Sequence, residues 1–193
     1  MRSTPIVALA ALSFLGAFAA CGSDVSSTED AKKAYMGLDP SVDKAITLGF
    51  SGYNEVSGAP GANIAPQGAD GGVSGTLSVS GQVDNGASAN KTMRLNETLS
   101  NYSDDGHVAY GTDQALPNLT MNLKNIPTGT LDGTLSGSFL MSGGLTGQVS
   151  LALSFAGDLE AAPDGGVQRK AGTTHITGTA TSPAGTYSVD VTR

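Results

Sequence analysis

Residues 73–83 read VSGTLSVSGQV, and this stretch decides the predicted fold. Its bulky apolar residues, Val73, Leu77, Val79 and Val83, all lie at odd positions, whereas every even position carries a serine, a threonine or a glutamine. Successive side chains of a β-strand point to opposite faces, so this alternation is typical of a strand with one face on a core and the other in water. The segment therefore predicts a half-buried strand.

The same period of two recurs along the rest of the chain. Turn signals such as residues 84–86 and 142–144 separate the runs, and connections this short make neighbouring strands antiparallel. The first run contains Ile46, Leu48 and Phe50 on one face. Together the runs predict strands at residues 46–50, 73–83, 93–99, 108–110, 119–123, 131–141, 145–155, 174–180 and 187–191.

These runs predict an all-β fold, an antiparallel meander of about nine strands with room for one short N-terminal helix. A sheet of this size curls, so a soluble β-barrel or β-sandwich is expected. Only one face of the strands is apolar and tryptophan is absent, which argues against a lipid-facing barrel. The predicted organisation is a signal peptide at residues 1–20, an acylated cysteine with a tether at 21–40, and a single β-domain at 41–193.

The predicted tether is polar and lacks strand character. Ser26 with Glu29, or Ser27 with Asp30, has the spacing of a helix capping box, and Gly37 is a candidate stop signal for a short helix. A disordered linker is the alternative for the same residues.

Cys21 is the only cysteine of the chain, so it forms no disulfide within a monomer. It follows Arg2 and the charge-free residues 5–20, which together have the pattern of a signal peptide. Residues 18–21, with the sequence FAAC, resemble the lipobox of bacterial lipoproteins. This resemblance implies a diacylglyceryl group on the Cys21 sulfur, cleavage just before Cys21, and acylation of the new amine, for example with palmitate.

The resemblance also implies a location, the bacterial cell envelope, with the membrane as a partner through the lipid anchor on Cys21. Gly22 stands where an aspartate would suggest retention in the inner membrane, which favours the outer membrane. Cleavage by an ordinary signal peptidase after residues 17–19 is one alternative, and it would release a soluble protein. An uncut membrane helix is the other, although the apolar run is shorter than the roughly 20 residues of a membrane span.

Composition narrows the function classes. The net charge of −7 argues against nucleic acid as a partner. His107 and His175 lack neighbouring metal ligands, and the chain contains no nucleophile elbow, zinc-protease motif or phosphate loop. We therefore expect neither an enzyme nor a protein that holds a metal or cofactor.

Glu97 is the candidate site residue that the pattern singles out. It shares its face with Met93, Leu95 and Leu99, so a regular strand would point its carboxylate into the core. Such burial is costly without a partner, and two explanations are open. Glu97 reaches water at a bulge or at the open end of the sheet, or it lies in a ligand cavity and orients an apolar guest. In the second case we expect Asn54, Tyr110 and Tyr187 beside it.

The leading functional hypothesis is a membrane-anchored envelope lipoprotein whose β-domain binds an apolar ligand or an envelope protein without catalysis. The alternative is a structural or adhesive cell-surface module that acts through its polar outer face and the loops at residues 58–72 and 160–170. A hydrolase built on scattered carboxylates is the third hypothesis, and no constellation of residues supports it.

Overall fold

A computed structural model describes residues 22–56, 62–84, 88–163 and 165–193. These ranges contain one long helix, α1 (Thr28–Glu55), followed by strands. The strands are β1 (Ala62–Asp70), β2 (Ser74–Asp84), β3 (Lys91–Ser103), β4 (Val108–Thr112), β5 (Asn118–Lys124), β6 (Thr130–Gly143), β7 (Gly147–Ala161), β8 (Val167–Arg169), β9 (His175–Ser182) and β10 (Gly185–Thr192).

The ten strands form one antiparallel sheet. Its main order is β1-β2-β3-β4-β6-β7-β9-β10; β5 also pairs with β3 and β6, and β8 pairs with β7. Strand β3 therefore pairs with β5 through its first half and with β4 at Tyr102. The predicted class, an antiparallel all-β fold with an N-terminal helix, is confirmed.

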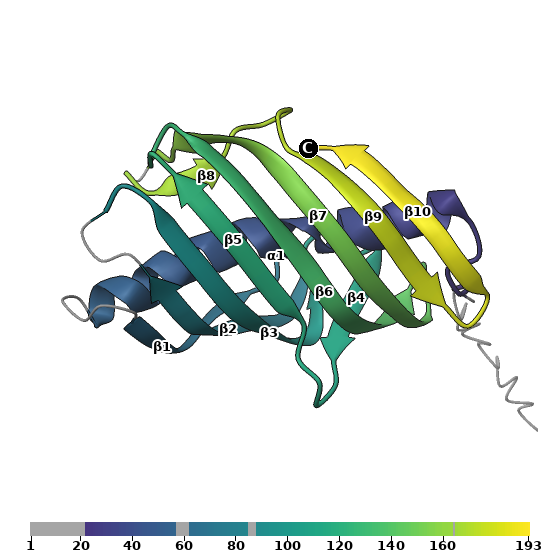
Figure 1. Ribbon diagram of the computed structural model, residues 1–193. Helices are drawn as coiled ribbons and strands as arrows, with labels where there is room; N and C mark the ends of the chain where they lie inside the picture. The colour runs from purple at the N-terminus through teal and green to yellow at the C-terminus, as the bar shows by residue number, and fades with distance from the viewer. Residues whose placement is uncertain (1–21, 57–61, 85–87, 164) are drawn as a thin grey trace, which may run out of the picture.

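The sheet curls around α1, which runs lengthwise along one face of the strands (Figure 1). The helix contacts β2, β3 and β4 and also both edge strands, β1 and β10. The inward side chains of the sheet and one face of α1 share a single hydrophobic core. The space that a curled sheet encloses is thus filled largely by the protein's own helix.

The buried face of α1 follows a helical repeat that includes Ala31, Tyr35, Leu38, Val42, Ala45, Gly49 and Gly52. Several of these residues are small, and they let the helix approach the strands closely. A Cβ atom at Gly49 would lie 3.0 Å from the Met93 Sδ atom, and one at Gly52 would lie 2.9 Å from the Ile64 Cβ atom.

The strand predicted at Ile46, Leu48 and Phe50 is therefore wrong, because these residues lie in α1. Three apolar residues at spacing two fit either structure, and the helical repeat through Gly49 and Gly52 decides in favour of the helix. Gly37 does not end the helix, which continues through Pro40.

The start of the helix agrees with the sequence. Ser27 is the N-cap residue, and its hydroxyl accepts a hydrogen bond of 3.1 Å from the Asp30 amide. Of the two predicted pairs, Ser27 with Asp30 is the one at the helix start, although the Asp30 carboxylate accepts from the Ser26 amide and the Ser27 hydroxyl instead of completing a capping box at the Ser27 amide. The helix that begins there is much longer than expected.

Residues 22–27 lie on the sheet instead of forming a free tether. The carbonyl of Ser23 accepts a 3.1 Å hydrogen bond from the Thr146 amide, and the Thr146 hydroxyl donates to the Gly22 carbonyl. The Ser182 hydroxyl donates to the Val25 carbonyl at 2.6 Å. The predicted tether is corrected accordingly, because these backbone groups are paired with the sheet and the residues after 27 belong to α1.

Two local features of the first strands also depart from expectation. Val73 is 62% exposed, because a register shift next to Gly75 separates it from the buried Leu77, Val79 and Val83. The loop predicted at residues 58–72 contains the edge strand β1, in which a second register shift accommodates Pro66. Among the described helices, none is long and apolar enough to cross a membrane.

Candidate ligand groove and buried polar network

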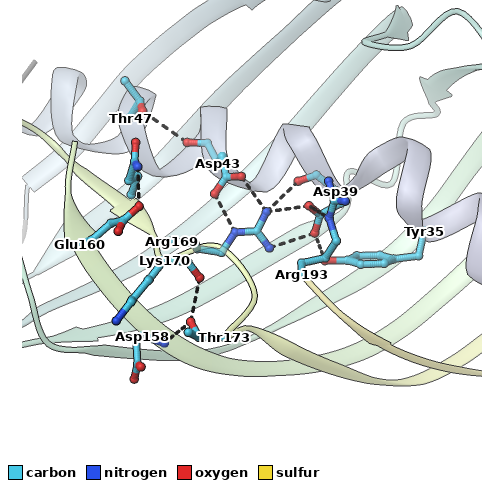
Figure 2. A network of polar contacts seen from close by, with 11 residues as sticks. Tyr35, Asp39, Asp43, Thr47, Asp158, Glu160, Arg169, Lys170, Thr173 and Arg193 are labelled. Atoms are coloured by element: carbon cyan, nitrogen blue, oxygen red, sulfur yellow. Dashed lines mark hydrogen bonds and ion pairs between the residues drawn. The ribbon is translucent and has the colours of Figure 1, made fainter. Parts of the chain in front are cut away.

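A buried polar network joins α1 to the last strands of the sheet (Figure 2). Asp39 accepts two hydrogen bonds of 2.9 Å from the Arg169 guanidinium, one on each carboxylate oxygen. The Tyr35 hydroxyl donates to Asp39 at 2.5 Å, and the Arg193 Nε atom donates at 3.0 Å. The other edge of the Arg169 guanidinium binds Asp43 at 2.6 and 2.8 Å.

Burial and ion pairing have opposite effects on the pKa values of the charged groups in this network. The side chains of Asp39 and Arg169 are 2% and 5% exposed. Burial alone would raise the pKa of the Asp39 carboxyl, but hydrogen bonds from Arg169, Tyr35 and Arg193 hold it below its usual range. Burial likewise disfavours the charged Arg169 guanidinium, yet Asp43 and Asp39 keep its pKa above the usual value. Asp39 and Arg169 thus both favour their charged forms, and the cluster forms a clamp between α1, β8 and Arg193.

A groove begins beside this clamp and follows α1 toward its C-terminal end. Its volume is about 670 Å³, within the range of small-molecule sites. We call it the α1–β8 groove, and it is lined by Asp43, Lys44, Thr47, Leu48, Phe50, Ala69, Ala162, Pro163, Gly166, Val167, Gln168 and Arg169.

The α1–β8 groove is amphipathic. Its charged residues are Asp43 and Lys44, which are adjacent on α1, and Arg169 on β8. Its apolar surface comes from Leu48, Phe50 and Val167. These three apolar side chains are only partly buried. A smaller hollow of about 300 Å³ shares Phe50, Gly166 and Val167 with the groove and continues to Tyr53, Asn54, Lys91 and Ile126. The lining could therefore contact a polar group at one end of a ligand and an apolar chain along the rest.

Lys44 is itself held in place. Its Nζ atom lies 2.5 Å from an Asp104 carboxylate oxygen, donates to the Asp70 carbonyl at 2.9 Å, and sits 4.9 Å from the centre of the Tyr102 ring. The Tyr102 hydroxyl also donates to Asp104. This second polar contact fixes the middle of α1 to the end of β3.

Glu97 points into the core, as its position in the strand predicts. It is 0% exposed, and neither carboxylate oxygen has a hydrogen-bond partner within the described residues. The explanation in which Glu97 reaches water at a bulge or an open end is therefore wrong, since it lies opposite Val79 in a regular stretch of the β2–β3 pair. Burial raises the pKa of the Glu97 carboxyl to about 7.

The other candidate cavity residues do not gather around Glu97. Tyr110 is buried on β4, and its hydroxyl donates to the Ala34 carbonyl at 2.8 Å, in the N-terminal half of α1. Asn54 is exposed near the C-terminal end of α1 and lines the smaller hollow. Tyr187 lies on the edge strand β10 and donates to the Ala184 carbonyl. The sequence pattern placed Tyr110 and Tyr187 on the inward faces of their strands, but it did not determine how far along the sheet each of them lies from Glu97.

The remaining candidates stay at the surface or outside the described residues. His175 binds the exposed Asp190 at 2.9 Å, and no group of three or more potential metal ligands occurs in the described ranges. Cys21 lies outside the described residues.

Sequence reasoning missed the clamp entirely. Arg169 and Asp39 are separated by 130 residues, and their pairing depends on how β8 folds back onto α1. One signal was present in the sequence, because Asp39 lies next to Leu38 in the apolar face of the helical repeat.

Comparisons with family models, curated proteins and solved structures find no match to this chain.

Proposed function

We propose that this protein is a lipid-anchored lipoprotein of the bacterial envelope, attached through Cys21, whose β-domain binds an amphipathic small molecule with an acyl-like chain. It would act as a binding protein and not as an enzyme. The outer membrane is the proposed location.

The α1–β8 groove is the observation that carries this proposal. Its walls are α1, β8 and the connection that leads into β8, while Leu48, Phe50 and Val167 leave apolar surface partly open to solvent. A ligand that covers such surface gains about 25 cal/mol for each Å² of apolar area removed from water. The charges at the clamp end would orient its polar group.

The proposal is tested with cis-parinaric acid, a fluorescent acyl chain, on the protein and on the variant Phe50→Asp. We expect binding to the parent protein and a loss of affinity of about tenfold or more in the variant. A tenfold loss corresponds to about 1.4 kcal/mol of binding free energy. Leu140→Asp is the matched control, since Leu140 is 48% exposed on β6, which lies outside the groove.

Native mass spectrometry of protein purified from cell extract complements this titration by identifying any guest that co-purifies. Failure of the parent protein to bind parinaric acid, together with a bare mass, would refute the small-molecule proposal. Equal losses in Phe50→Asp and Leu140→Asp would place binding outside the groove.

A second candidate function, adhesion to a neutral polysaccharide, is favoured by the outer face of the sheet. Registered pairs place uncharged polar side chains in rows across the strands. One row contains Ser80, Asn96, Asn118, Ser136, Thr179 and Ser188 and is interrupted only by Ala152 on β7. Co-sedimentation with insoluble peptidoglycan, chitin or cellulose tests this candidate, and no retention on any of them would exclude these polymers.

A further inference from the structure

Glu97 is a buried acid in an apolar setting. Its neighbours on the inward face of β3 are Leu95 and Leu99, and the residue opposite it on β2 is Val79; all are buried. Both carboxylate oxygens lack a hydrogen-bond partner within the described residues. An unpaired ionised carboxylate in such a place is strongly disfavoured, so the closed structure accommodates the protonated acid.

Among the described residues no cation is paired with the Glu97 carboxylate. Lys91, on the same face of β3 but six residues away, lies 5.7 Å from the centre of the Tyr53 ring. Tyr102 on β3 has its pKa raised first by burial and then by Asp104, with a smaller contribution from Glu97 itself. Tyr110 on β4 donates to a helix carbonyl. From α1, Asp43 is engaged by Arg169 and Lys44 by Asp104, while the inward residues of β2 and β5 are apolar.

Strand β3 cannot turn Glu97 toward water without breaking the sheet. It pairs with β2 from Thr92 to Ser103 and with β5 from Lys91 to Asn96. The cover on this part of β3 is α1, since a Cβ atom at Gly49 would contact Met93 and Leu95 within 3.4 Å. The helix is therefore the element whose displacement would hydrate Glu97.

The two halves of α1 are held differently. Up to Lys44, the helix is fixed by the Asp39–Arg169 clamp, by the Tyr110 hydroxyl and by the contact between Lys44 and Asp104. Residues 45–55 are held mainly by apolar packing, in which Ala45, Ile46, Gly49 and Gly52 are buried. Their polar contacts at the far end include the exposed Gln67–Glu55 hydrogen bond and the Lys91 cation 5.7 Å from the centre of the Tyr53 ring.

We propose that Glu97 is a proton-controlled latch: loss of its proton to solvent displaces residues 45–55 of α1 from β3, with Lys44 as the hinge, and widens the α1–β8 groove. The displacement of the helix is inferred from the packing around Glu97 and does not depend on the proposed function. The change in the groove rests on the proposed function, because residues 47–50 line it.

The size of the effect follows from the two states of Glu97. The pKa of the Glu97 carboxyl is about 7 in the closed protein, and it returns to its ordinary value of 4.5 when water reaches the carboxyl in the open protein. The ratio of open to closed protein therefore rises about 30-fold between about pH 5.5 and about pH 8.5. Opening is thus favoured on the alkaline side.

The chain contains no tryptophan, so a single Tyr53→Trp substitution in the full chain reports on the mobile half of α1. We expect acrylamide to quench this tryptophan more strongly at about pH 8.5 than at about pH 5.5, with a midpoint near pH 7. The same substitution combined with Glu97→Gln should show no such transition. Met36→Trp, in the clamped half, is the positional control and should not respond to pH.

Equal quenching at both pH values would overturn the latch, as would a pH response that persists with Glu97→Gln or that appears equally at Met36→Trp. Binding of cis-parinaric acid to the parent chain at the two pH values separates the two proposals. Absence of binding at both values refutes the proposed function and leaves the tryptophan result intact. Displacement without a change in affinity refutes the link between the latch and the groove.

Discussion

Removal of the Arg169 guanidinium is the most direct test of the clamp. The variant Arg169→Leu deletes both hydrogen bonds of 2.9 Å to the Asp39 carboxylate and leaves that carboxylate 2% exposed, with only Tyr35 and Arg193 as partners. Breaking a buried ion pair from one side costs about 3–5 kcal/mol, because the remaining charge is stranded. We expect a loss of this size in the free energy of unfolding at neutral pH.

The pH dependence of this loss identifies its cause. In the parent protein the pKa of Asp39 is held below its ordinary value of 3.8, so its stabilising contribution is present at neutral pH and is lost as the pH falls below about 4. Without Arg169, burial is opposed only by the hydrogen bonds from Tyr35 and Arg193, so the pKa of Asp39 rises from its value in the parent protein. Protonation then removes the stranded charge, and the difference between variant and parent should shrink between about pH 7 and about pH 4.

Urea denaturation followed by far-ultraviolet circular dichroism measures these differences. The double variant Asp39→Asn with Arg169→Leu should recover most of the loss, because it removes the charge and keeps an acceptor for Tyr35. Arg94→Leu is the matched control: Arg94 is 47% exposed and pairs with Asp84, so its removal should cost less than about 1 kcal/mol. A loss from Arg169→Leu no larger than the control's, or one that does not depend on pH, would refute the reasoning.

Three further variants test the core and the helix start by the same denaturation assay. Glu97→Gln should stabilise the protein by up to about 3 kcal/mol above about pH 8 and have little effect below about pH 4.5, since only the parent loses stability as the pH rises from 4.5, the ordinary pKa of Glu97, to about 7, its pKa in the folded protein; an equal gain at both pH values would contradict this. Gly52→Ala should destabilise by about 1–3 kcal/mol despite the better helix propensity of alanine, because its Cβ atom would lie 2.9 Å from that of Ile64. Ser27→Ala should cost about 1 kcal/mol by removing the N-cap, and Ser27→Thr should retain most of it.

The sheet could be predicted from the sequence because its strands have one solvent-exposed face, so polar and apolar residues alternate along them. Leu77, Val79 and Val83 are buried as their spacing requires, and the inward position of Glu97 follows from the same rule. The helix was underestimated because the signals that usually end a helix, Gly37 and Pro40, lie inside it, and because small residues on its buried face carry little hydrophobic signal.

The clamp and the groove could not be predicted in this way. The partners of Asp39 come from residues 130 and 154 positions away, and only the folded sheet brings them together. Local periodicity states which face of an element is buried, but it contains no information about which distant cation meets a given carboxylate. The groove has the same origin, because its lining comes from α1, from Ala69 on β1, and from β8 with the connection that precedes it.

The attachment of residues 22–27 to the sheet limits how far the folded body could lie from a lipid anchor. A chain lipidated at Cys21 would have no slack between its anchor and the folded body, because the pairing with Thr146 begins at Gly22. The helix rises about 1.5 Å per residue, so Phe50 lies about 33 Å along α1 from Thr28. The short connection would keep the groove close to the membrane surface, where it would meet molecules presented at that surface.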